Sequence, residues 1–222
     1  MSAAIASLLS DDMARVCFNA LCFSPARSTV KTTRIHLGPT GFRATGTDGY
    51  AIGQDQCPLD TYDGPPEGVT LHIDRAALSD LDSGGRKDKK GYGRVEIKAG
   101  DGLVFKPANN DTPTVAHDQG ANADTALWGM VDTLLQRMER SAPALPELIA
   151  FDPALLAYFS KVKVAKVKGA SNENLERAMD LCVFDAKEPV LVKIGPTFRG
   201  AIMPIDRDVH RENVERLDGG LW

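Results

Sequence analysis

The spacing of apolar residues changes along the first fifty residues, and the change marks two kinds of element. After Ser10, apolar side chains recur every three or four residues, which places them on one face of a helix; they are Met13, Val16, Cys17, Ala20 and Leu21. Ser10 with the acidic Asp11 and Asp12 predicts the start of this helix, and Ser24-Pro25 its end. From Thr32 to Ile52 the period is two, which predicts consecutive antiparallel strands. Gly38-Pro39 and Asp48-Gly49 supply the turns between them.

A second unit follows a predicted crossover linker over residues 60–68. Residues 69–73 alternate as a strand that runs into Asp74, an N-cap for a short helix carrying Ala77, Leu78 and Leu81. Residues 83–91 are rich in Gly and Lys and predict an exposed loop. Strands are expected near residues 95–97, 103–105 and 114–116. The second unit is therefore strand, helix and strands.

The pattern of this second unit occurs again. Phe151-Asp152-Pro153-Ala154-Leu155-Leu156 parallels Ile73-Asp74-Arg75-Ala76-Ala77-Leu78, and strands are expected near 181–183, 190–193 and 201–203. Between the repeats, residues 124–141 have helical spacing. The chain is interpreted as a complete domain (1–118), a helical linker (119–147) and a half-domain (148–222), with residues 206–220 as a tail or a single exposed helix. The last strand, through Ile202, is apolar, and we expect it to favour self-association unless helix 124–141 caps it.

Composition and charge narrow the class of protein. Of 222 residues, 43% are hydrophobic and 25% charged, as in ordinary globular domains, and the formal net charge of −4 excludes a protein that coats nucleic acid through bulk positive charge. The four cysteines and four histidines show no metal-ligand spacing, so we expect no metal and no cofactor. With no signal peptide and no run of 18 apolar residues, a reduced, cytoplasmic protein is expected.

Two motifs near opposite ends of the chain resemble one family. Ala44-Thr45-Gly46-Thr47-Asp48-Gly49-Tyr50-Ala51-Ile52 resembles the A-T-D-G-x-R-L strand of bacterial β sliding clamps, and Met203-Pro204-Ile205 resembles their M-P-M ending. Taken alone, the first motif is an ordinary β-turn. The resemblance, to the bacterial or phage DNA polymerase β clamps, implies an α+β DNA clamp fold with antiparallel sheets outside and helices on the inner face.

The resemblance also implies a pocket for the peptide tails of polymerases and other replication proteins. Carried over to this chain, the pocket residues are Thr47, Gly49, Tyr50, Ile52, Val131, Met203, Pro204 and Ile205. The alternative is that these apolar residues fill a core. Ala51 stands where the family commonly has Arg, so the polar contacts of that Arg are absent and partner preference is expected to differ.

The resemblance further implies that some basic residues face duplex DNA without reading its sequence. Arg15 and Arg75 lie on the two helices expected to face a ring interior, and a run without acidic residues carries Lys161, Lys163, Lys166 and Lys168 in a strand-like alternation. The alternative for the lysines is a solvated sheet edge protected by charge.

The sequence shows no motif of an enzyme: there is no P-loop, no H-E-x-x-H and no G-x-S-x-G. We therefore expect a non-enzymatic protein. The leading hypothesis is a clamp-like processivity factor that tethers a polymerase or other replication proteins to duplex DNA, and a homo-oligomer is the assembly that this hypothesis implies. The alternative is an open, non-ring adaptor that binds the same peptides and regulates or sequesters their owners.

Overall fold

The computed structural model describes residues 3–86, 93–107, 113–120, 125–144, 149–165 and 178–206. Its strands are β1 (Ala4–Leu9), β2 (Thr32–Gly38), β3 (Gly41–Thr47), β4 (Ala51–Cys57), β5 (Thr61–Asp63), β6 (Val69–Asp74), β7 (Arg94–Ala99), β8 (Gly102–Pro107), β9 (Thr114–His117), β10 (Met179–Cys182), β11 (Val190–Ile194) and β12 (Phe198–Ile202). Its helices are α1 (Ser10–Cys22), α2 (Arg75–Arg86), α3 (Thr125–Arg140) and α4 (Pro153–Phe159). None of the described helices is long and apolar enough to cross a membrane.

Two antiparallel sheets hold the strands together. One has the order β5-β1-β7-β8-β9, and the other, here called the large sheet, has the order β10-β11-β12-β4-β3-β2-β6. The first strand of each unit crosses to the other unit, because β1 pairs with β7 and β6 pairs with β2. The predicted α+β class is confirmed. The division of the chain at residues 118 and 147 stays a prediction.

The predicted repeat of the second unit in the third is present, and the first unit has the same element order. A helix followed by three strands occurs as α1-β2-β3-β4, as α2-β7-β8-β9 and as α4-β10-β11-β12. The predicted caps recur with it: the Asp74 carboxylate accepts from the Ala77 amide at 2.8 Å, and Asp152 accepts from Ala154 at 2.8 Å. Local sequence therefore sets where the second and third helices begin.

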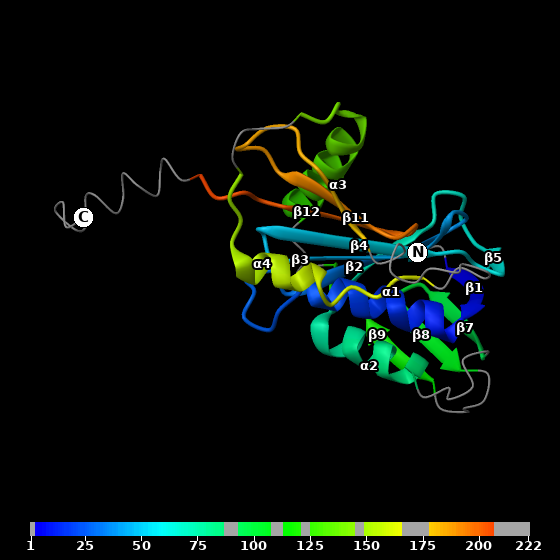
Figure 1. Cartoon of the computed structure of the whole chain (residues 1–222). Helices are drawn as coiled ribbons and strands as arrows, with labels where there is room; N and C mark the ends of the chain where they lie inside the picture. The colour runs from blue at the N-terminus through cyan, green and yellow to red at the C-terminus, as the bar shows by residue number, and fades with distance from the viewer. Residues whose placement is uncertain are drawn as a thin grey trace, which may run out of the picture.

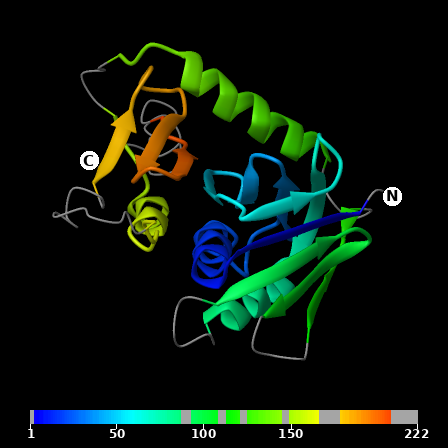
Figure 2. The same cartoon turned by 90° about the vertical axis from the view of Figure 1, so that its right-hand side faces the viewer.

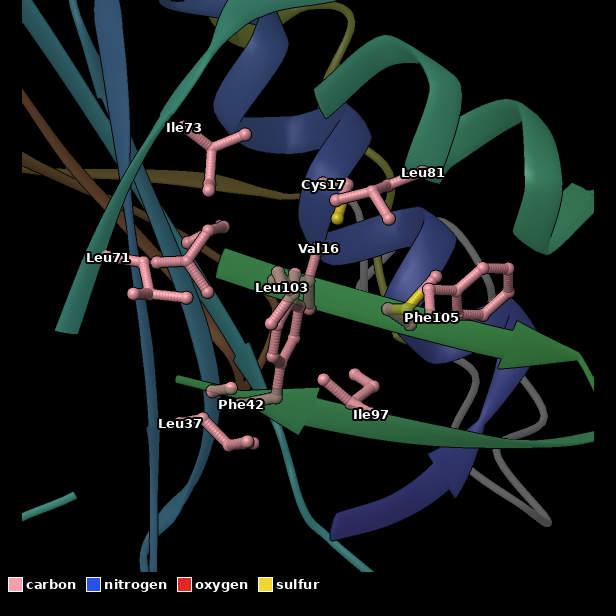
Figure 3. Close-up of a cluster of buried hydrophobic side chains, with 14 of the residues drawn as sticks. Val16, Cys17, Leu37, Phe42, Leu71, Ile73, Leu81, Ile97, Leu103 and Phe105 are labelled. Atoms are coloured by element: carbon pink, nitrogen blue, oxygen red, sulfur yellow. The ribbon is translucent and has the colours of Figure 1, made fainter. Parts of the chain in front are cut away.

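The main core lies between the two sheets and helices α1 and α2. Figure 3 shows part of it, with Val16 and Cys17 of α1 facing strand residues such as Leu103 and Phe105. These side chains are buried because alternate strand positions point inward, where both helices cover them. Burial of so many apolar side chains is what stabilises this part of the chain.

Both faces of the large sheet are covered where the third unit joins it. α3 lies on one face, and α1 and α4 lie on the other (Figures 1 and 2). Neighbouring residues of β4 divide between the faces: Ala51 packs with Phe23 and Phe159, and Ile52 packs with Trp128 and Val131. Because both faces of β4 are covered, neighbouring residues of this strand are buried alike, including the polar Gln54 and Asp55.

The structure corrects several predictions. β1 was not expected at all, and β5 lies within the predicted linker 60–68. The helix start was wrong by one position, since Leu9 occupies the N-cap and Ser10 is the first helical residue. α2 continues through Arg86, where a loop from Ser83 was predicted. The described lysine run, through residue 165, forms no strand, and the charged segment after residue 206 lies outside the described residues.

The expectation of self-association through the last strand was also wrong in its cause. β12 pairs with β11 on one side and with β4 on the other, so both of its edges are satisfied within the chain. Helix α3 covers a face of the sheet and does not cap its edge. The apolar character of β12 is therefore explained by burial.

Candidate functional site

The Asp48-Gly49 step forms a tight turn between β3 and β4. The Asp48 carboxylate accepts from the amides of Tyr50 at 2.9 Å and Ala51 at 2.8 Å, and the Thr47 hydroxyl donates to the Ala51 carbonyl at 2.8 Å. Gly49 has φ 97°, a conformation that side chains with a Cβ disfavour. The turn is therefore fixed by its own polar groups, and it leaves the next side chain, Tyr50, 68% exposed.

The last described segment of the chain meets this turn. Because β12 pairs with β4, the Met203 amide reaches the Tyr50 carbonyl at 3.0 Å, and two residues later the Ile205 amide donates to the Ala150 carbonyl at 2.8 Å. Met203 is 38% and Ile205 41% exposed. Tyr50, Met203 and Ile205 thus form an exposed apolar surface, here called the junction surface.

The other residues predicted for the peptide pocket occupy different surroundings. Thr47 is buried within the turn, and Ile52 and Val131 are buried together between the large sheet and α3. Gly49 lies at the tip of the turn, and Pro204 lies between the two exposed apolar residues of the C-terminal motif. The structure therefore brings both motifs together. Of the residues predicted for the pocket, Tyr50, Met203 and Ile205 are exposed, whereas Thr47, Ile52 and Val131 are buried.

Tyr158 of helix α4 lies next to Asp48 of the turn. Partial burial and the neighbouring Asp48 carboxylate raise the pKa of Tyr158 above its ordinary value. The Tyr158 ring also packs edge-on against Phe23 with centroids 5.9 Å apart. The turn that carries Tyr50 is thus held by a residue of the third unit.

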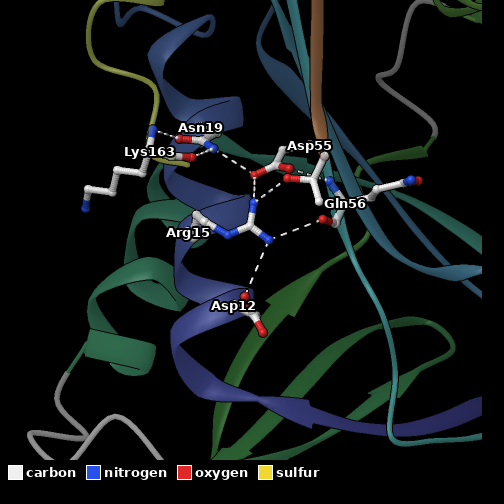
Figure 4. Close-up of polar contacts among 7 residues, drawn as sticks. Asp12, Arg15, Asn19, Asp55, Gln56 and Lys163 are labelled. Atoms are coloured by element: carbon white, nitrogen blue, oxygen red, sulfur yellow. Dashed lines mark hydrogen bonds and ion pairs between the residues drawn. The ribbon is translucent and has the colours of Figure 1, made fainter. Parts of the chain in front are cut away.

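Figure 4 shows a buried polar network on α1 that the sequence did not reveal. The Arg15 guanidinium forms an ion pair with Asp55, and it also donates to the Gln56 carbonyl at 3.2 Å. The Asn19 side chain donates to Asp55 at 2.7 Å. It also donates to the Lys163 carbonyl and accepts from the Lys163 amide, both at 2.8 Å. The network therefore ties α1 to β4 and to the segment after α4.

The predicted DNA-facing residues differ in exposure and in whether their side chains already have partners. Arg15 is only 7% exposed and its guanidinium is occupied by the network, which corrects the prediction that it is presented to phosphate. Arg75 is exposed at the start of α2 and donates to the Ser24 carbonyl. Lys161 is exposed, and the ammonium of Lys163 lies 3.9 Å from the centroid of the Phe18 ring. Lys166 and Lys168 lie outside the described residues.

The described residues offer no metal centre, since they contain no group of three or more His, Cys, Asp or Glu side chains that could hold an ion. All four cysteines lie in described ranges and none is in a disulfide. Burial raises the pKa of the Cys17 and Cys57 thiols well above the usual range, so neither is suited to act as a nucleophile.

No protein-family model matches the sequence, and no curated protein sequence matches it either. Solved structures do match: a putative DNA polymerase III beta subunit from Eubacterium rectale gives a TM-score of 0.61 at 11% identity over 92% of this chain. The chain has the sliding-clamp fold.

Two further structures with this fold agree. The DNA polymerase III beta subunit of Thermotoga maritima gives a TM-score of 0.62 at 9% identity, and the sliding clamp of Pseudomonas aeruginosa gives 0.61 at 11% identity, each over 91% of this chain. The chain spans 66% of the length of the first of these three clamps and 65% of the other two. The expected fold is thus confirmed, while identities this low carry the fold alone.

Proposed function

We propose that this protein is a sliding-clamp-like processivity factor that tethers replication proteins to DNA by binding their linear apolar peptides at the junction surface. The pairing of β12 with β4 carries the proposal, because it places Tyr50 beside Met203 although the two motifs lie far apart in the sequence. The clamp fold supports it independently of the motifs.

The composition of the junction surface suits an apolar peptide. Tyr50 offers a large ring with few rotatable bonds, and Met203 and Ile205 offer flexible and branched apolar contacts beside it. Exposed aromatic side chains are frequent anchors of protein interfaces. Since Tyr50 and Met203 are joined through backbone atoms, the two anchors keep their spacing before a partner arrives.

Replacing Tyr50 or Met203 with Ala is expected to weaken peptide binding, because each change removes an apolar anchor. Loss of an anchor of this kind costs about 2 kcal/mol, which corresponds to roughly a thirtyfold rise in Kd. Fluorescence polarisation with a labelled short peptide of the clamp-binding type measures it. The matched control is Met130→Ala on α3, a methionine that is 63% exposed and belongs to neither motif.

Peptide affinity that is unchanged in both Tyr50→Ala and Met203→Ala, with circular dichroism showing intact folds, would remove the junction surface as the site. An equal loss in Met130→Ala would point to a general effect of exposed methionines. Neither result depends on DNA binding, so this part of the proposed function is tested separately.

A second candidate function, the open adaptor, is favoured by the charges on the helices opposite α3. Arg15 is neutralised by Asp55, the exposed residue of the first turn of α1 is Asp11, and α2 presents Asp80 as well as Arg75. A face with mixed charge gives phosphates less attraction than a basic one. An adaptor that binds peptides without encircling DNA needs no such face.

DNA binding distinguishes the two candidates. In a processivity factor, Arg75, Lys161 and Lys163 are expected to contact phosphates, so affinity for duplex DNA is weak, independent of sequence and lost steeply with salt, with a logarithmic slope of about −0.9 per phosphate neutralised. The double variant Arg75→Gln/Lys161→Gln is expected to make that slope less steep by the contribution of about two phosphate contacts. Lys106→Gln in β8 is expected to leave the slope unchanged. Fluorescence anisotropy over a salt series measures both.

Light scattering in the same buffers supplies the molecular mass. A strictly monomeric protein at high concentration that binds no DNA would leave the adaptor as the function, and an assembly of several chains supports a ring. Sequence-selective binding that survives high salt contradicts both candidates.

A further inference from the structure

A cavity of about 430 Å³ opens beside the end of α3, on the face of the large sheet that this helix covers. It is lined from both sides of the seam between β4 and β12. Arg43, Gln54 and Gln56 come from β3 and β4, whereas Lys193 and Arg199 come from β11 and β12. No feature of the junction surface or of the buried network on α1 accounts for this concentration of polar side chains.

The basic residues of this cavity are not equally neutralised. Arg199 forms an ion pair with Glu139 of α3, and its Nε donates to the Gln54 side chain at 2.7 Å. The side chains of Arg43 and Lys193 form no hydrogen bond or ion pair with any residue that the structure describes, and the Nε of Arg43 is fully buried without an acceptor. With one carboxylate, Glu139, against three cations, the cavity keeps two positive charges.

The electrostatic surroundings agree with this count. Burial lowers the pKa of Arg43, and the positive charges of Arg199 and Arg34 lower it further. The pKa of His36 on the neighbouring strand is lowered by burial and then by Arg43 and Arg34. Burial is the main cause of both shifts, and the neighbouring arginines add to it more than Asp132 offsets, so this part of the sheet carries an excess of positive charge.

We propose that this cavity binds a small phosphate-bearing molecule, with the phosphate held between Arg43 and Lys193. Arg43 is half-buried and lines the cavity without an acidic partner among the described residues, so the accessible part of its guanidinium can donate to an anionic oxygen. A phosphate carries the two charges that the cavity lacks, and Arg matches its oxygens in pairs while Lys adds a point charge.

The remaining lining indicates what else the ligand carries. A cavity of this size lies within the range of small-molecule sites and is much larger than one phosphate group. The Gln56 side-chain amide and the Thr40 hydroxyl line the cavity without a hydrogen-bond partner among the described residues, whereas Gln54 is engaged by Thr45 and Arg199 and the Thr197 hydroxyl accepts from Arg15. The rest of the ligand is therefore polar, as in a nucleoside or a sugar.

The position of the cavity gives binding a structural consequence. Since β3 and β4 supply one half of the lining and β11 and β12 the other, a bound anion bridges the seam that also positions Tyr50 beside Met203. A ligand that binds only the folded state stabilises it, so binding raises the melting temperature. This inference does not rest on the proposed function.

Isothermal titration calorimetry tests the site with two probes, pyrophosphate and adenosine monophosphate. We expect both to bind the full chain, and we expect Arg43→Gln or Lys193→Gln to weaken binding at least tenfold. Lys193 is exposed, so its variant keeps the fold testable if Arg43→Gln unfolds. The matched control is Lys98→Gln, an exposed lysine on β7 of the other sheet, which leaves binding unchanged.

The two probes separate the possible sources of phosphate. Tighter binding of adenosine monophosphate indicates an organic phosphate, and tighter binding of pyrophosphate indicates an inorganic one; both support the site. No heat from either probe at 10 mM overturns the proposal, and so does equal binding by the wild type and Lys193→Gln. Neither overturning result bears on peptide binding by the junction surface.

Discussion

Replacing Asp55 with Ala is expected to lower the free energy of unfolding by about 3–5 kcal/mol, which is the typical cost of leaving one charge of a buried ion pair without its partner. The Asp55 side chain is fully buried and accepts from both Arg15 and Asn19. Without it, the Arg15 guanidinium keeps only the Gln56 carbonyl, Thr197 and the distant Asp12 as acceptors. Chemical denaturation followed by circular dichroism measures the change.

Asp12→Ala is the matched control for Asp55→Ala. Asp12 is partly exposed and lies 3.5 Å from the same guanidinium, so its loss is expected to cost less than about 1 kcal/mol. The double variant Arg15→Met/Asp55→Leu is expected to recover much of the stability, because it removes both charges together. If Asp55→Ala is no more destabilising than Asp12→Ala, the buried network does not hold α1 to β4.

Replacing Phe23 with Ala is expected to cost about 3–5 kcal/mol, the usual range for deleting a buried aromatic side chain. Phe23 is fully buried just after α1, with ring centroids 4.8 Å from Phe159 and 5.7 Å from Phe198. Gly53 of β4 permits this packing, since a Cβ at that position would overlap the Phe23 ring. The truncation leaves a cavity between the first and third units that rigid strands cannot fill.

Tyr50→Ala is the control for this aromatic deletion. Tyr50 is 68% exposed, so its truncation is expected to leave stability within about 0.5 kcal/mol while weakening peptide binding. For Phe23→Ala, unfolding is expected to become less cooperative, because the third unit meets the rest of the chain through this cluster. A single unchanged transition at wild-type stability would show that the seam between β4 and β12 holds without Phe23.

These two stability predictions bear on function through the same seam. The junction surface and the proposed phosphate site both draw residues from β4 on one side and from the third unit on the other. Phe23 and the Arg15–Asp55 pair support this seam from the face opposite α3. Loosening it is therefore expected to weaken both kinds of binding, in addition to lowering stability.

The sequence by itself determined the elements whose signals are local. The Asp48-Gly49 turn, the caps at Asp74 and Asp152 and the helical spacing of residues 124–141 each depend on residues a few positions apart, and each predicted element is present. Such local signals were sufficient to predict the repeated units. Together with the resemblance of two motifs, they were sufficient to predict the clamp fold.

Only the tertiary structure decided which elements pair and which charges are neutralised. Strand β1 has the buried alternation of Ala4, Ala6 and Leu8, but small apolar residues predict a strand weakly until its partner β7 is known. Arg15 looked available because Asp55 lies forty residues away, and Arg43 and Lys193 meet only because β12 docks on β4. Sheet pairing joins residues without regard to their separation in sequence, so contacts of this kind have no local signal for the sequence to display.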